Sequence, residues 1–224
     1  MKLPYSGYLQ PPAGPVLLYY ITDRRQFPGG PEQQKQKLLW KIAECIAAGV
    51  DLIQLREKDL AIRTLEELGK KAAALFPREG KSKLLINSRA DVALACGAHG
   101  VHLPANDISS SEARTIFAQA GNAHPLIGVS VHSLEELARA EAHAADFAVF
   151  GPVFQKDGHV IADGVQRLRE ACHKADRCMP VLALGGITAE NAQECRAAGA
   201  DGIAAIRLFQ ENDVTEIAKK FRRI

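Results

Sequence analysis

The chain has 224 residues, 47% of them hydrophobic and 24% charged, and its 28 Lys and Arg against 26 Asp and Glu give a formal net charge of +2. This balance excludes a disordered segment and a basic nucleic-acid binder, and leaves a small or phosphorylated ligand as the better expectation. No apolar run reaches the roughly 20 residues that span a bilayer, and the start of the chain lacks the apolar stretch of a secretory signal, so we expect a soluble cytoplasmic protein with no membrane partner.

The beginning of the chain differs in composition from the rest. Residues 1–16 contain four prolines and two glycines, which predicts an irregular N-terminal arm. A continuous apolar run from Leu17 to Thr22 follows and is typical of a strand buried on both faces. No interdomain linker interrupts the chain after it, so we expect residues 17–224 to form one domain.

Four segments repeat one pattern, in which a helix end rich in Ala and Gly leads into a short apolar run. They read AAGVDLIQLR, ACGAHGVHLP, HAADFAVFGP and AAGADGIAAIR. The steps between equivalent residues, from Asp51 to His99, Asp146 and Asp201, are 48, 47 and 55 residues. Each interval has room for two strand-helix units, so the repeat predicts eight units.

Further apolar runs supply the remaining strands, at Lys83–Asn87, Leu126–Ser130 and Val181–Leu184. Helical patterns lie between the runs. Leu65, Leu68, Ala72 and Leu75 share one helical face, and Ser133 with Glu136 is typical of a capping box. Parallel strands joined by helices predict an α/β protein with a single (β/α)8 TIM barrel. An open, doubly wound sheet is the alternative.

Ligands of such barrels bind where the strands end at their carboxyl side. After the second strand, the alternation of side chains is expected to direct Gln54, Arg56 and Lys58 to one mouth. An amide and two cations there favour an anion site, and the alternative is a solvated loop of mixed charge.

Polar residues also follow the third, fourth and fifth strands. Asn87 and Asp107 are oxygen ligands of the type that Mg²⁺ accepts, although an Asn there is more often a turn former and an Asp a helix cap. The fifth strand ends at Ser130 and His132, and a histidine titrates near neutrality, which suits acid-base chemistry. As an alternative, a lone histidine is more often structural.

The seventh and eighth strands end in a second candidate anion site. Gly185 and Gly186 follow the seventh strand, and Ile206 and Arg207 follow the eighth. Glycines before a helix let backbone N–H groups approach an anion, and barrels frequently bind phosphate after these two strands. The alternative is that the turn alone requires the glycine pair.

The motifs YYITD, QLREK, VHL, GVSVHSLEE, FGPVF, LALGGIT and AGADGIAAI occur in this order from about Tyr19 to Phe209. In order and spacing the chain resembles the thiamine phosphate synthase and TenI family. The resemblance implies a (β/α)8 barrel of thiamine biosynthesis. It further implies an enzyme that joins a hydroxymethylpyrimidine pyrophosphate to a thiazole phosphate and releases pyrophosphate.

The resemblance also implies residue roles. The pyrophosphate would be held by Gln54, Arg56 and Lys58 beside Asn87, Mg²⁺ by Asp107, the pyrimidine near Ser130 and the thiazole phosphate by Gly185, Gly186, Ile206 and Arg207. Of these, Arg56, Lys58 and Ser130 are the candidate catalytic residues. His132 and Lys156 are further candidates for substrate binding.

Three positions depart from the synthase pattern. Ser88 stands where the family has a second metal-binding Asp, which predicts weaker Mg²⁺ binding. The segment Gln155–His159 replaces a Thr-rich loop that ends in Lys, and Arg207 replaces a small polar residue. A TenI-like tautomerase or a non-catalytic phosphate-binding paralogue is therefore the alternative. At the position where the family's tautomerases carry their base, however, this chain has Pro152. Of the histidines near the mouth, His102, His132 and His159, none matches that base.

Overall fold

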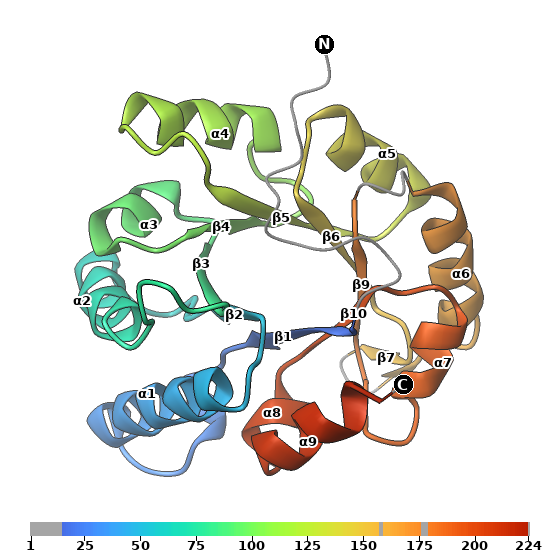
Figure 1. Cartoon of the computed structure of the whole chain (residues 1–224), viewed down its shortest axis with the longest axis horizontal. Helices are drawn as coiled ribbons and strands as arrows, with labels where there is room; N and C mark the ends of the chain where they lie inside the picture. Colours follow the sequence, from blue (N-terminus) through green and yellow to red (C-terminus); the bar gives the residue numbers. More distant parts are fainter. Residues whose placement is uncertain (1–14, 157–158, 176–178, 224) are drawn as a thin grey trace.

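Eight parallel strands close into a barrel with helices around it in the computed structural model of the chain (Figure 1). The structure describes residues 15–156, 159–175 and 179–223, without the side chain of Lys156. The hydrogen-bonded order is β1, β10, β9, β6, β5, β4, β3, β2 and back to β1. The strands are β1 (Leu17–Ile21), β2 (Leu52–Leu55), β3 (Lys83–Asn87), β4 (Gly100–Leu103), β5 (Leu126–Val131), β6 (Phe147–Phe150), β9 (Val181–Leu184) and β10 (Gly202–Ala205). The predicted (β/α)8 barrel is confirmed.

Helices connect successive strands on the outside of the barrel, as parallel pairing requires. They are η1 (Arg24–Gln26), α1 (Pro31–Ala47), α2 (Ile62–Ala73), α3 (Ala90–Cys96), α4 (Ser110–Gln119), α5 (Leu134–Ala142), α6 (Gly164–Lys174), α7 (Ala192–Ala197), α8 (Arg207–Gln210) and α9 (Val214–Phe221). A two-stranded hairpin of β7 (Gln155–Lys156) and β8 (His159–Val160) lies in the loop between β6 and α6. None of the helices in the described ranges is long and apolar enough to cross a membrane.

Several sequence predictions need correction at their edges. The first strand ends at Ile21, before Thr22, and the fifth continues to Val131. Leu75 lies beyond the end of α2 and is 37% exposed, so it does not share the buried face of that helix. Of the predicted arm, residues 1–14 lie outside the described part, whereas Val16 is buried and already belongs to the core.

The capping box predicted at α5 is only half present. Ser133 accepts a hydrogen bond from the backbone N–H of Glu136 at 3.2 Å, as expected. The Glu136 carboxylate accepts from the N–H of His132 at 2.6 Å, one residue before the position that the box requires. This contact joins the start of α5 to the end of β5.

The fourfold repeat has a structural role at the beginning of the strands. Each repeated residue accepts a hydrogen bond from a backbone N–H of the preceding barrel strand. The four bonds are Leu18 N to Asp51 Oδ2 at 2.8 Å, Leu84 N to His99 Nδ1 at 3.0 Å, Ile127 N to Asp146 Oδ2 at 2.7 Å and Val181 N to Asp201 Oδ2 at 2.9 Å. These side chains join the strands in pairs at the end of the barrel opposite its mouth.

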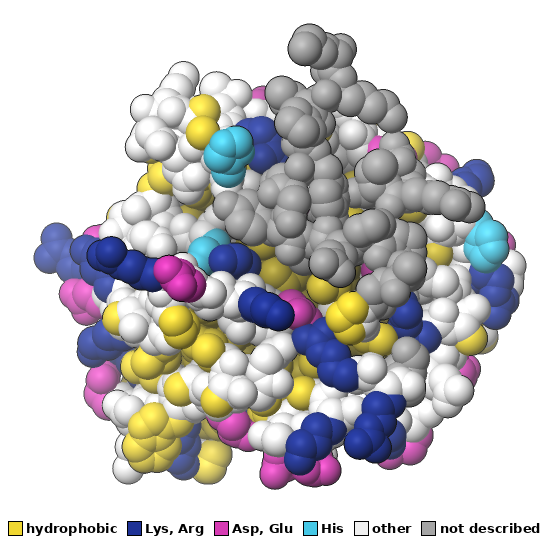
Figure 2. Space-filling view, in the orientation of Figure 1, with side chains coloured by type: hydrophobic (Ala, Val, Ile, Leu, Met, Phe, Trp, Pro, Cys, Tyr) yellow, Lys and Arg dark blue, Asp and Glu magenta, His cyan; other side chains and the backbone are white. Residues whose placement is uncertain are grey.

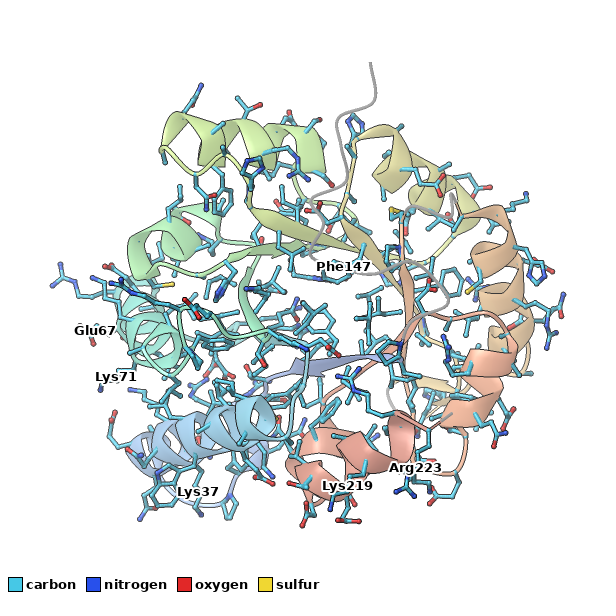
Figure 3. The ribbon with its side chains drawn as sticks, viewed as in Figure 1. Lys37, Glu67, Lys71, Phe147, Lys219 and Arg223 are labelled. Atoms are coloured by element: carbon cyan, nitrogen blue, oxygen red, sulfur yellow. The ribbon has the colours of Figure 1, made fainter. Side chains whose placement is uncertain are left out.

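Apolar side chains fill the barrel itself, and a second, larger apolar layer packs between the strands and the helices. The inner set includes Tyr19, Leu85 and Phe147, and Phe147 lies within the ring of strands in Figure 3. A Cβ on Gly128 would lie 2.2 Å from the ring of Phe147, so the glycine makes room for it. The filled interior separates the mouth from the opposite end.

Candidate active site

A buried ion-pair network fixes the ends of β1 and β2. The Glu57 carboxylate accepts hydrogen bonds from Thr22 Oγ1 at 2.6 Å and from Arg24 Nη1 at 2.9 Å. Arg24 also pairs with Asp59 at 2.6 Å, and Thr22 Oγ1 accepts from the backbone N–H of Arg56 at 2.9 Å. Thr22, Arg24 and Glu57 are all buried. The network therefore sets the position of Arg56, a role that no sequence pattern indicated.

Arg56 and Lys58 provide positive charge at this rim. Because β2 ends at Leu55, alternation directs Gln54 inward and Arg56 toward the mouth, whereas Lys58 lies in the following turn and is exposed. Neither cationic side chain makes a hydrogen bond or ion pair with another described residue. The Arg56 charge lowers the pKa of Lys58, which places the two cations close together. Lys and Arg side chains lie near the middle of the face in Figure 2.

Below these cations lies a buried polar layer inside the barrel. His102 Nε2 and Ser130 Oγ are 2.9 Å apart, and the His102 ring contacts the ring of Tyr19 at 5.7 Å. Burial, with the nearby charge of Arg56, lowers the pKa of His102 to about 3, so the imidazole is neutral at pH 7. Three buried atoms of this layer have no hydrogen-bond partner in the part of the chain that the structure describes: Tyr19 Oη, Gln54 Nε2 and His102 Nδ1. Such atoms suit a polar ligand.

The candidate metal residues follow β3 and β4. Ser88 has a positive φ of 62° and donates a hydrogen bond to Asp107 Oδ2, while Asp107 Oδ1 accepts from the N–H of Ile108 at 2.8 Å. Asn87 pairs with His102 in the register of the two strands. Both oxygens of the single carboxylate are thus engaged within the loop. This donor set does not fit a Mg²⁺ ion held by the protein alone, because the remaining ligands would have to come from substrate phosphates.

A cavity with a volume of about 500 Å³ lies at the mouth, at the ends of β9 and β10. Its lining includes Gly185, Gly186, Thr188, Ile206, Arg207 and Gln155. Arg207 is exposed and makes no hydrogen bond or ion pair through its side chain with another described residue. The structure therefore brings the residues of the predicted phosphate site together.

The glycine pair has a structural reason of its own. Gly185 and Gly186 have φ values of 109° and 67°, and a Cβ on Gly186 would lie 2.6 Å from the Cβ of Gln155. A side chain there would therefore collide with the loop that follows β6 and would not enter the cavity. Helix α7 starts only at Ala192, so the expectation of a helix directly after the glycines is wrong.

The remaining candidates lie in the loops that follow β5 and β6. His132 directly follows β5, and its Nδ1 lies 2.5 Å from the carbonyl oxygen of Gly151. The side chain of Lys156 lies outside the described part, so its role stays a prediction. His159 is exposed in β8. These contacts hold the loops after β5 and β6 together, and they do not place His132 within reach of another candidate site residue.

Comparisons with known proteins place the barrel in one family. A family model described as thiamine monophosphate synthase matches residues 18–209. A putative thiamine-phosphate synthase of Geobacter sulfurreducens is 42% identical over 192 residues, covering 84% of each chain. A thiamine-phosphate synthase of Methanoculleus marisnigri is 38% identical over 216 residues, covering 92% of this chain and 93% of the relative. The solved structure of a thiamine phosphate pyrophosphorylase from Pyrococcus furiosus is similar with a TM-score of 0.75 at 35% identity, covering 93% and 94%.

Proposed function

The chain belongs to the thiamine monophosphate synthase family, and we propose that it joins hydroxymethylpyrimidine pyrophosphate to thiazole phosphate as a transferase of thiamine biosynthesis. In this reaction the bond between the pyrimidine methylene carbon and the pyrophosphate oxygen breaks. A bond from that carbon to the thiazole nitrogen forms, and pyrophosphate leaves with the electron pair. The observation that carries the proposal is the presence of two separate cationic sites at the same end of the barrel.

The first site suits the pyrophosphate. Arg56 and Lys58 lie close together with no protein anion on their side chains among the described residues. Their charges would stabilise the negative charge that develops on the departing group, which is where electrostatic catalysis has its largest effect. The ion-pair network of Glu57 holds the backbone of Arg56 in place before substrate binds.

The second site suits the thiazole phosphate. Arg207 and the loop of Gly185 and Gly186 line one cavity together with Ile206, at the start of α8. Inside the barrel, the atoms of Gln54 and His102 that have no partner among the described residues suit the polar edge of a pyrimidine, with Ser130 2.9 Å from His102. The low pKa of His102 makes its imidazole a weak base, which supports a role in binding and not in proton abstraction.

A magnesium ion would add charge stabilisation for the leaving group, as Mg²⁺ does in phosphoryl chemistry. The hydrogen bond from Ser88 to Asp107 argues for weak binding of this ion here. The proposal therefore assigns stabilisation of the leaving pyrophosphate to the cations of the chain.

The same Ser88 contact favours a second candidate function, a TenI-like protein that binds a thiazole phosphate without coupling it. A tautomerase of this type would need a base at the end of β6. Pro152 occupies that position and carries no base.

One assay separates the two functions. Purified protein is mixed with Mg²⁺ and either substrate or both, and pyrophosphate is measured with a coupled enzyme. The proposal expects release that requires both substrates and that falls sharply in Arg56→Ala, while Lys219→Gln on the outer helix α9 keeps the natural rate. Binding of thiazole phosphate without any release of pyrophosphate would support the TenI-like function and contradict the synthase.

A further inference from the structure

Gln210, the last residue of α8, joins two segments that lie 187 residues apart in the chain. Its Oε1 accepts a hydrogen bond from the N–H of Asp23 at 3.0 Å, and its Nε2 donates to the carbonyl oxygen of Asp23 at 3.1 Å. The side-chain amide thus bonds both backbone groups of one residue, as a neighbouring strand would. The pairing of β1 with β10 ends at Tyr20 and Ala205, so this amide continues the connection beyond the ends of the strands.

Asp23 lies between the two residues that build the ion-pair network of the first site. Thr22 accepts a hydrogen bond from the N–H of Arg56 and donates one to the carboxylate of Glu57. On the other side of Asp23, Arg24 pairs with the same carboxylate. The backbone that Gln210 holds is therefore connected to the backbone of Arg56 through Thr22 alone.

The other end of this connection carries the second site. Helix α8 has a single turn and lies between α1 and α9 in Figure 1, and its first residue, Arg207, lines the cavity at the ends of β9 and β10. The N–H of Gln210 donates to the carbonyl oxygen of Ile206 at 3.1 Å, so Gln210 lies one helical turn after the residues that line the cavity. One turn of helix has little stability of its own. The position of α8 therefore depends on the burial of Leu208 and Phe209 and on the bonds of Gln210.

We propose that Gln210 is a positioning residue of the coupling reaction, whose amide fixes the distance between Arg207, at the thiazole phosphate, and Arg56, at the pyrophosphate. This inference rests on the proposed function. Coupling requires the thiazole nitrogen to reach the pyrimidine methylene carbon while both substrates are held by their phosphates, and a misplacement of about 1 Å can slow a reaction by about 100-fold. Each substrate alone needs only its own site, so the binding of either by itself does not depend on this distance.

Two variants test the role of the amide. Gln210→Ala removes both hydrogen bonds, and Gln210→Leu removes them while it keeps most of the side-chain volume. Both are expected to lower kcat for pyrophosphate release by about tenfold or more, because the substrates no longer meet at the right distance. Calorimetry is expected to find the affinities for thiazole phosphate alone and for pyrophosphate alone close to those of the natural chain.

The product, thiamine phosphate, gives a second readout that does not depend on turnover. It contains the pyrimidine and the thiazole phosphate joined by one bond, so it occupies both parts of the site only when their separation is right. The pyrimidine part is tied to the same segment, because the carbonyl oxygen of Gln54 accepts from the N–H of Thr22 at 3.0 Å. Both variants are therefore expected to bind thiamine phosphate about tenfold or more weakly.

Gln166→Ala is the matched control. Gln166 is an exposed glutamine of α6 whose amide bonds Arg169 and Glu170 on the same helix, far in the chain from either site. This variant is expected to keep the natural kcat and the natural affinity for thiamine phosphate. Urea unfolding shows first that each variant is folded.

Natural kcat and natural thiamine phosphate affinity in folded Gln210→Leu would overturn the proposal, because the hydrogen bonds would then not set the distance. Equal losses in kcat and in the affinities for the separate substrates would also overturn it, since Gln210 would then support the fold of one site and not the distance between two. If the natural chain releases no pyrophosphate, the proposed function is contradicted, and the affinity for thiamine phosphate still decides whether Gln210 sets the separation.

Discussion

Arg24 and Arg56 follow neighbouring strands at the same rim of the barrel. We expect Arg24→Ala to lower the folding stability and Arg56→Ala to lower the affinity for pyrophosphate. The side chain of Arg24 is 7% exposed and pairs with Glu57, which is 1% exposed. Loss of Arg24 leaves the buried Glu57 carboxylate without its cation and is expected to cost about 3–5 kcal/mol of folding free energy. That cost corresponds to a fall of about 6–20 °C in melting temperature for a chain of this size.

Arg56→Ala removes a side chain that pairs with no other described residue and lies close to Lys58, so unfolding stability is expected to change by only about 0.5 kcal/mol. Loss of hydrogen bonds to a charged ligand is worth about 1.5–3 kcal/mol, so pyrophosphate affinity is expected to fall by about ten- to 150-fold. Urea unfolding and calorimetry with pyrophosphate measure the two quantities on the same samples. A large loss of stability in Arg56→Ala with unchanged pyrophosphate affinity would show that Arg56 is part of the wall and would refute the reasoning.

Three further predictions concern the polar interior, the metal and the phosphate cavity. The pKa of His102 is lowered to about 3 in the folded chain, from a value near 6.5 in the unfolded chain. Between these two pH values the unfolded chain binds more protons, so the free energy of unfolding falls with acidification by at most about 1.4 kcal/mol per pH unit. Urea unfolding between pH 4 and 7 measures this slope, which His102→Gln should lower; an equal slope in the variant contradicts the prediction. Ser88→Asp is expected to raise the coupling rate and its Mg²⁺ dependence, because Asp107 would share the ion; a rate that is fast in the natural chain and unimproved by the carboxylate goes against it. Arg207→Ala is expected to lower the affinity for thiazole phosphate, measured by calorimetry, by about tenfold or more. Unchanged affinity would show that Arg207 is not part of the phosphate site.

The fold followed from sequence because parallel strands buried on both faces leave continuous apolar runs. Lys83–Asn87 and Val181–Leu184 were predicted to the residue. The errors lie at the ends of strands. Thr22 continues the run of strand-forming residues in the sequence, but β1 ends before it, and its hydroxyl donates a hydrogen bond to Glu57. The regular spacing of Asp51, His99, Asp146 and Asp201 was detected, whereas its cause, a bond to the preceding strand, required the structure.

The candidate site was predictable only as a set of strand ends. Sequence position was enough to bring Gly186 and Arg207 to one cavity, since both follow strands that are neighbours in the barrel. Contacts between residues far apart in the chain left no local signal. Tyr19 beside His102 and Arg24 beside Glu57 are examples, because each partner alone reads as an ordinary strand or loop residue.

The four bonds that join the strands in pairs also show where the chain can be divided. Each bond links residues within one half of the sequence, with Leu18 to Asp51 and Leu84 to His99 before residue 121 and the other two after residue 125. A cut in the exposed segment around Gly121 leaves every bond within one fragment. The barrel is thus built from two halves that each retain their own strand-pairing bonds, an arrangement suited to fragment complementation, to circular permutation and to an origin by duplication of a half-barrel.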